Sequence, residues 1–150
     1  MPRLPSFGFA AARRLEAHSS MKTTIRQRVI FRASPARVFE AIIDERRHEA
    51  FTGARAKISR RVGGAFSCYG GYIKGINLDL VRAKRIVQAW RSRDWPLGTF
   101  SIVTFALSRR ATGGTVLSFT HLGVPASDFR AKVSGWRSHY WKPLKAYLEK

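Results

Sequence analysis

Few side chains in this 150-residue sequence have the types and spacing that enzyme chemistry needs. His121 is the best candidate for acid–base work, because an unperturbed histidine titrates at about pH 6.5. Its nearest carboxylate by strand parity is Asp79. Ser101, Cys68 and the histidines show no arrangement of nucleophile, base and orienting acid. A lone histidine in a core strand is more often structural, so the sequence favours a non-catalytic protein and keeps an enzyme that uses His121 as an alternative.

The sequence predicts no cofactor and no metal. The histidines show no metal-ligand spacing with Cys68 or with one another. The glycine pairs at 63–64, 70–71 and 113–114 precede strand-like stretches and not helices, so none forms a phosphate-binding loop. A single cysteine excludes an internal disulfide and fits a reducing compartment. No apolar run approaches the ~20 residues of a membrane span, and we expect a cytoplasmic protein.

Charge is the unusual feature of the composition. Basic residues number 28 and acidic residues 9, for a formal net charge of +19. This excess indicates either a nucleic-acid or other anionic partner, or the background of an arginine-rich proteome. The basic residues are spread along the chain without a block of five or six, and no recognised nucleic-acid reader motif is present. The sequence therefore predicts weak attraction to anions and no specific nucleic-acid partner.

A long amphipathic helix is predicted in the last stretch, residues 123–150. Its apolar residues recur at steps of three and four, which is typical of one face of an α-helix. They are Phe129, Val133, Trp136, Tyr140, Leu144 and Tyr147. Pro143 lies inside this stretch, where it should remove the backbone bond to His139 and kink or segment the helix. Such an aromatic face requires a broad apolar surface to pack against.

That surface is predicted to be a curved antiparallel sheet. Alternation and glycine-bounded runs indicate seven strands at hairpin spacing. They cover residues 23–33, 54–60, 65–69, 72–80, 85–92, 99–107 and 115–122. Ser34-Pro35 begins a short helix through Ile43, and residues 44–50 form a second. Residues 1–20 lack this patterning, and we expect them to be a disordered or leader-like extension ahead of one domain at 21–150.

Several spaced motifs make the sequence resemble a known family. They are HEAFTG at 48–53, the glycine pair 63–64 with Phe66, IVQAWR at 86–91, DWPLG at 94–98 with Ser101, GVP at 123–125, GW at 135–136 and YWKPLK at 140–145. In this order they resemble the C-terminal-domain type of the activator of heat-shock protein 90 ATPase. That family belongs to the START-like and birch-pollen-allergen superfamily. The resemblance implies an α+β helix-grip fold, in which the sheet wraps around the C-terminal helix.

The resemblance also implies a cavity between the concave sheet face and the helix, which in many relatives holds a hydrophobic ligand. Strand parity indicates which side chains would line it, as an aromatic and aliphatic wall with four polar groups. The candidate ligand-binding residues are Phe51, Phe66, Ile73, Asn77, Gln88, Trp90, Ser101, Phe105, Phe119, His121, Trp136 and Tyr140. The alternative is that the four polar groups satisfy one another in a filled core.

We therefore expect a non-catalytic binding protein that holds a small hydrophobic or amphipathic molecule. Two alternatives stay open. One is a chaperone-cofactor domain that binds heat-shock protein 90, although the eukaryotic activator has a separate N-terminal domain that carries much of its chaperone contact. The other is an enzyme of the cyclase or dehydratase kind that uses His121.

Overall fold

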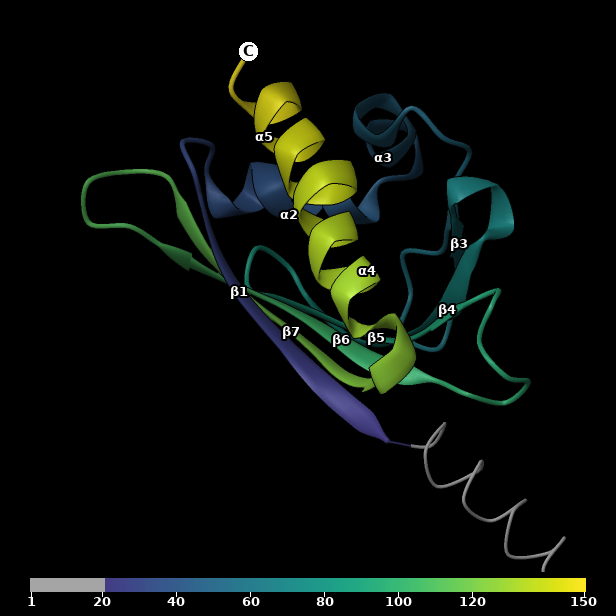
Figure 1. Ribbon diagram of the computed structural model, residues 1–150. Helices are drawn as coiled ribbons and strands as arrows, with labels where there is room; N and C mark the ends of the chain where they lie inside the picture. Colours follow the sequence, from purple (N-terminus) through teal and green to yellow (C-terminus); the bar gives the residue numbers. More distant parts are fainter. Residues whose placement is uncertain (1–20) are drawn as a thin grey trace, which may run out of the picture.

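The computed structural model describes residues 21–150, so the expectation for residues 1–20 lies outside the described part. Within it, seven strands form one antiparallel sheet in the order β1-β7-β6-β5-β4-β3-β2 (Figure 1). The strands are β1 (Lys22–Phe31), β2 (Lys57–Ile58), β3 (Ala65–Cys68), β4 (Ile73–Val81), β5 (Arg85–Ser92), β6 (Ser101–Arg109) and β7 (Thr115–Pro125). Apart from the contact between β1 and β7, every neighbouring pair is consecutive along the chain, as expected for a meander.

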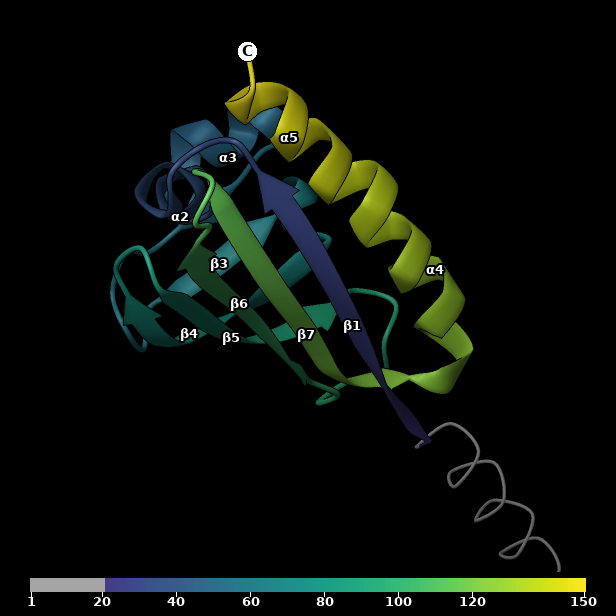
Figure 2. The ribbon, with the colours of Figure 1, turned by 90° about the vertical axis from the view of Figure 1, so that its left-hand side faces the viewer.

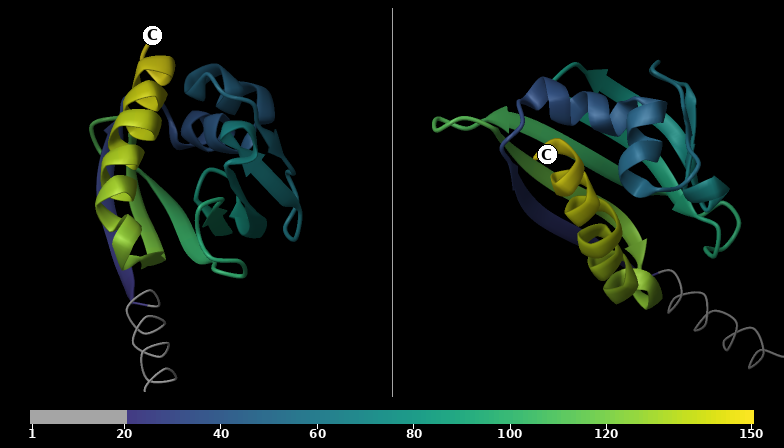
Figure 3. Two further views of the ribbon diagram at one scale, coloured as in Figure 1. Left: turned by 45° about the vertical axis from the view of Figure 1, so that its right-hand side comes forward. Right: turned by 90° about the horizontal axis from the view of Figure 1, so that it is seen from above.

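Helices cover one face of this sheet. The short helices α2 (Pro35–Ile43) and α3 (Glu45–Thr52) follow β1, and the C-terminal helix crosses the concave face beside them (Figures 2 and 3). That helix consists of α4 (Phe129–Gly135), the π-helical turn η3 (Trp136–Trp141) and α5 (Lys142–Leu148), preceded by the 3-10 turn η2 (Ala126–Asp128). This is the predicted helix-grip fold. No helix within residues 21–150 is long and apolar enough to cross a membrane.

Local sequence signals explain where the short helices begin and end. The Ser34 side chain accepts a hydrogen bond from the Arg37 amide at 3.3 Å, and Pro35 occupies the first helical position of α2. Asp44 caps α3 in the same way through the Arg47 amide at 3.0 Å. Gly53 ends α3 in the left-handed conformation, with φ 72°.

The predicted strand at 54–60 is wrong in extent, because only Lys57–Ile58 pairs with β3. The carboxylates of α3 take its amide groups instead: Glu49 accepts from the Ala56 amide at 3.0 Å, and Glu45 accepts from the Ile58 amide at 3.0 Å. These side-chain hydrogen bonds satisfy two backbone N–H groups that have no strand partner on this side in the described part of the chain. Glu45 and Glu49 of α3 thus cover this edge of the sheet.

The interruption expected at Pro143 takes the form of a π turn in a continuing helix. The Lys142 amide donates to the Arg137 carbonyl, five residues back. Since Pro143 has no N–H, the carbonyl of His139 lacks its helical donor, and the hydroxyl of Tyr69 donates to it at 2.7 Å. The wider turn also changes which residues face the core. Trp141 and Leu148 are buried although the regular helical period did not predict them.

The core lies between the sheet and the C-terminal helix. Trp136 packs on Phe119, with ring centroids 4.4 Å apart, and stacks on Trp141 at 5.4 Å. Phe105 and Phe119 extend the cluster on the sheet side at 5.4 Å from each other. At Gly75, a Cβ atom would come within 1.8 Å of the Ala89 carbonyl oxygen and 2.6 Å of the Phe66 ring, so only glycine fits at this position.

Candidate functional site

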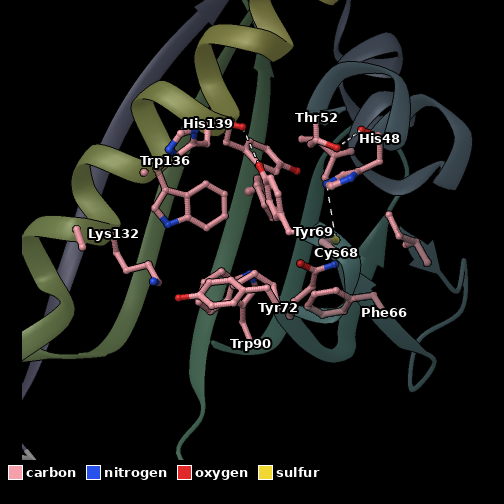
Figure 4. Close-up of a pocket in the computed structure, with 18 residues that line it drawn as sticks. His48, Thr52, Phe66, Cys68, Tyr69, Tyr72, Trp90, Lys132, Trp136 and His139 are labelled. Carbon is pink, nitrogen blue, oxygen red and sulfur yellow. Dashed lines mark hydrogen bonds between the residues drawn. The ribbon is translucent and has the colours of Figure 1, made fainter. Parts of the chain in front are cut away.

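A cavity of about 550 Å³ lies between the C-terminal helix, α3 and the β3–β5 end of the sheet. In Figure 4, Trp136 and Lys132 reach in from the helix, whereas Phe66, Tyr69 and Tyr72 come from the opposite side. The lining is mostly apolar and aromatic. It comprises Ile42, His48, Thr52, Ile58, Phe66, Cys68, Tyr69, Tyr72, Ile73, Gln88, Trp90, Phe105, Ala131, Lys132, Gly135, Trp136, His139 and Tyr140.

The structure brings part of the predicted lining to this cavity. The residues that do line it are Phe66, Ile73, Gln88, Trp90, Phe105, Trp136 and Tyr140. The other predicted residues, Phe51, Asn77, Ser101, Phe119 and His121, are buried but do not line it. Strand parity indicates the face on which a side chain lies. It does not indicate which inward side chains the helix covers.

Two of the predicted polar groups, Asn77 and Gln88, satisfy each other. The Gln88 amide donates to the Asn77 Oδ1 at 3.0 Å, and the Asn77 Nδ2 donates to the carbonyls of Ser59 at 2.7 Å and Arg61 at 3.2 Å. Asn77 is fully buried, so these bonds offset the cost of removing its amide from water. They tie the loop that precedes β3 to the centre of the sheet.

The other two polar groups, Ser101 and His121, form a buried pair whose hydrogen bonds have a defined direction. The Trp136 indole N–H donates to His121 Nδ1 at 3.0 Å, so the proton of the neutral imidazole is on Nε2. Nε2 in turn lies 2.7 Å from the Ser101 Oγ, which donates to the Trp90 carbonyl at 2.9 Å. His121 therefore donates to the serine, and this arrangement does not prepare it to remove the serine proton.

Burial holds His121 in this neutral state. Desolvation lowers the pKa of His121 to about 3, with a smaller contribution from the charge of Lys132. The expected carboxylate partner is absent, because Asp79 lies beyond a bulge after Asn77 that reverses the parity of β4. Asp79 instead pairs with Arg85 at 2.8 Å. The geometry assigns His121 to the core.

Sequence reasoning missed a second buried histidine, His48, on the wall of the cavity. His48 is 2% exposed, and its Nε2 lies 3.8 Å from the Sγ of Cys68. Burial lowers the pKa of His48 to about 4, partly opposed by the charge of Glu49, and raises the pKa of the Cys68 thiol to about 12. The pair is therefore neutral. Phe66 and Cys68 lie on the same face of β3, so strand parity applied to Phe66 would have indicated Cys68 as well.

Among residues 21–150, the Nδ1 of His48 has no hydrogen-bond partner. A buried polar atom without a partner is uncommon in folded proteins and requires an explanation. No group of three or more histidine, cysteine, aspartate or glutamate residues in this part of the chain is placed to hold a metal ion.

The polar ends of three side chains surround the mouth of the cavity. Tyr69 bonds to the helix as described above, Tyr72 donates to Asp94 at 2.6 Å, and Lys132 pairs with Asp128 at 2.8 Å. Tyr69 adopts the left-handed conformation, with φ 52°, which is unusual for a residue with a side chain. The backbone is thus held in a strained conformation where a tyrosine bridges from η1 (Tyr69–Gly71) to the helix.

Comparison with known proteins places this fold and its motifs in a family. A sequence model described as "Activator of Hsp90 ATPase homolog 1-like protein" matches residues 32–149. The chain belongs to this family. Among its relatives are activators of 90 kDa heat shock protein ATPase homologues from Dictyostelium discoideum, 30% identical over 81% of this chain, and from Homo sapiens, 31% identical over 77% of this chain. Those matches cover 32% and 34% of the relatives, so the chain spans about a third of their length.

Solved structures of other proteins share the fold. An HSP90 activator from Plasmodium falciparum superposes with a TM-score of 0.80 at 24% identity, over 84% of this chain and 96% of that one. A protein from Chromobacterium violaceum superposes with a TM-score of 0.69 at 29% identity, over 85% and 97% of the two chains. The predicted resemblance and fold are confirmed.

Proposed function

We propose that this chain is a non-catalytic binding protein that holds a small hydrophobic or amphipathic molecule between the sheet and the C-terminal helix. The observation that carries the proposal is an unfilled cavity beside Gly135. Gly135 has ordinary helical dihedral angles, and a Cβ atom there would meet nothing within 4 Å. Glycine inside a helix costs about 1 kcal/mol relative to alanine. Neither backbone geometry nor packing requires glycine here, and the missing side chain leaves the cavity open beside the helix.

The size and chemistry of the cavity support the proposal. Its volume of about 550 Å³ lies within the range of ~300–1,000 Å³ that is usual for small-molecule sites. Aromatic and aliphatic walls suit an apolar body, and His48 Nδ1 is available for one polar group of the ligand. At the mouth, Lys132 and the hydroxyls of Tyr69 and Tyr72 suit an amphipathic molecule whose polar end faces water.

Filling the space beside Gly135 should block this site without unfolding the protein. We expect Gly135→Leu to fold normally and to melt at the same or a higher temperature, because leucine is a better helix former. Its affinity for the amphipathic probe 1-anilinonaphthalene-8-sulfonate should fall by at least about tenfold, which corresponds to ~1.4 kcal/mol of steric overlap. Gly135→Ala, the matched control, should bind within about twofold of the parent protein, since it adds only one methyl group.

Fluorescence titration of the three proteins measures this, and near-UV circular dichroism checks that each core is intact. Native mass spectrometry of the purified protein adds an independent readout, in which the parent should carry a small-molecule adduct that Gly135→Leu lacks. Equal probe affinity in Gly135→Leu and Gly135→Ala would contradict the proposal, as would a parent protein with neither probe binding nor adduct.

A second candidate function, binding to heat-shock protein 90, is favoured by family membership. We propose that the domain docks on this chaperone and changes its ATPase rate, with a net charge of +19 assisting contact with an acidic partner. Because the chain matches only about a third of the curated activators, the activity of the whole activator is not implied. Both candidate functions agree with the expected cytoplasmic location.

An ATPase assay of the cognate chaperone tests this second candidate. The rate should change with increasing domain concentration and reach a plateau, and Gly135→Leu should behave like the parent if docking does not use the cavity. An unchanged rate at saturating domain, together with no complex in sedimentation, would rule out chaperone docking. The probe titrations of the cavity would not be affected by that outcome, because they do not involve the chaperone.

A further inference from the structure

A basic groove lies on the other side of the C-terminal helix, between that helix and the edge strand β1. Figure 2 shows β1 and the helix running side by side. The groove has a volume of about 540 Å³ and is lined by Arg26, Gln27, Arg28, Val29, Arg137, Trp141, Lys142 and Lys145. Five of these residues are basic and none is acidic. Within residues 21–150, no carboxylate forms an ion pair with any of the five.

The floor of the groove is rigid. Trp141 is 5% exposed, and its indole N–H donates to the Gln27 Oε1 at 2.6 Å. The Gln27 amide then donates to the Val133 carbonyl at 3.2 Å, which closes the link from strand to helix. The cationic side chains therefore project from two elements held at a constant separation. A site organised in this way loses less conformational entropy on binding than a flexible surface.

The strand side of the groove offers backbone groups as well as charge. Within residues 21–150, β1 ends the strand order and pairs only with β7, so the backbone N–H and C=O groups on its other side have no strand partner in this part of the chain. Charged side chains on an edge strand often serve to prevent aggregation, and Arg26 and Arg28 alone would fit that explanation. It does not account for Arg137, Lys142 and Lys145, which approach the same groove from the helix.

We propose that this groove binds an extended acidic segment of a partner protein, which adds a strand to the free edge of β1. Acidic side chains on one face of the added strand would meet the three cations of the helix, Arg137, Lys142 and Lys145, and its backbone would pair with the alternating donors and acceptors of the edge. A phosphodiester chain offers acceptors only and would leave the carbonyls of the edge unpaired. A second copy of this chain would bring its own Arg26 and Arg28 to the edge, and like charges would oppose each other.

Charge reversal in the groove tests the proposal against general electrostatic attraction. The probe is a fluorescein-labelled ten-residue peptide of alternating threonine and glutamate. Arg137→Glu/Lys145→Glu should bind it about 30-fold more weakly than the parent, since two exposed ion pairs are replaced by repulsions. The control is Arg82→Glu/Lys84→Glu, on the exposed turn between β4 and β5, which changes net charge equally and should stay within about twofold.

A second peptide with N-methyl groups on alternate residues tests strand addition, because it cannot form the ladder. It should bind more weakly than the parent peptide, and hydrogen exchange should slow at β1 amides only with the unmodified peptide. Equal weakening by the groove and control reversals would overturn the proposal, and so would equal binding of the two peptides. Groove-dependent binding of duplex DNA or phosphatidylglycerol vesicles that exceeds peptide binding would also overturn it, as would a dimer that buries β1.

Discussion

Trp136→Ala is expected to lower the free energy of unfolding by about 4 kcal/mol, the usual cost of truncating a buried aromatic side chain. Trp136 is 6% exposed and contacts aromatic rings from both the sheet and the helix. Its loss enlarges an existing cavity, and it also leaves the Nδ1 of His121 without a donor. Two penalties therefore act at one position.

Equilibrium unfolding in urea measures this change, with the slope of the transition compared between variants. Leu97→Ala is the matched control, because Leu97 is 96% exposed and its truncation should change stability by less than about 0.5 kcal/mol. Trp136→Phe keeps part of the packing but loses the hydrogen bond, so it should fall between the two. A loss below about 1 kcal/mol for Trp136→Ala would show that the helix contributes little to the core.

The protein is expected to lose stability as the pH falls below about 6.5, through its two buried histidines. The folded-state pKa values of His48 and His121 are lowered to about 4 and about 3. Between these values and 6.5 the unfolded chain binds more protons than the folded one, so stability rises with pH in this window. Each pKa unit corresponds to about 1.4 kcal/mol, and the two groups together therefore remove several kcal/mol by pH 4.

Thermal or urea unfolding between pH 7 and pH 4 measures this dependence. His48→Gln and His121→Gln should each flatten the slope, even if they lower stability at pH 7 through lost packing and hydrogen bonds. The control is Leu97→Ala, which removes no titratable group and lies at a 96% exposed position, so it should retain the parent slope. A parent protein equally stable at pH 7 and pH 4 would contradict the account, because it would require both histidines to be accessible to protons without unfolding.

Strand parity predicted only part of the lining of the cavity. Parity placed Ile73 and Trp90 on the concave face, and both line the cavity. It failed beyond Asn77, because a bulge adds one residue to β4 and turns Asp79 outward. Bulges have no strong sequence signature, so a carboxylate partner for His121 was expected on the wrong face.

The wall on the helical side was harder to predict. His48 and Lys132 reach the cavity because of the angle at which α3 and the C-terminal helix lie on the sheet, which local periodicity does not define. The π turn is a similar case. Pro143 indicated that the His139 carbonyl would lose its donor, but not that Tyr69, seventy positions away in the chain, would supply another.

The sequence by itself determined the fold, and its spaced motifs indicated the family by resemblance. Alternation, glycine-bounded turns and one aromatic helical stripe are local properties, and together they leave few arrangements that bury the apolar faces. Only the tertiary structure decided the chemistry of the interior. Three features depend on side chains that are far apart in the chain. They are the directions of the hydrogen bonds to His121, the nitrogen of His48 that has no partner within residues 21–150, and the basic groove between β1 and the C-terminal helix. The relative positions of these side chains arise from packing, which no local pattern encodes.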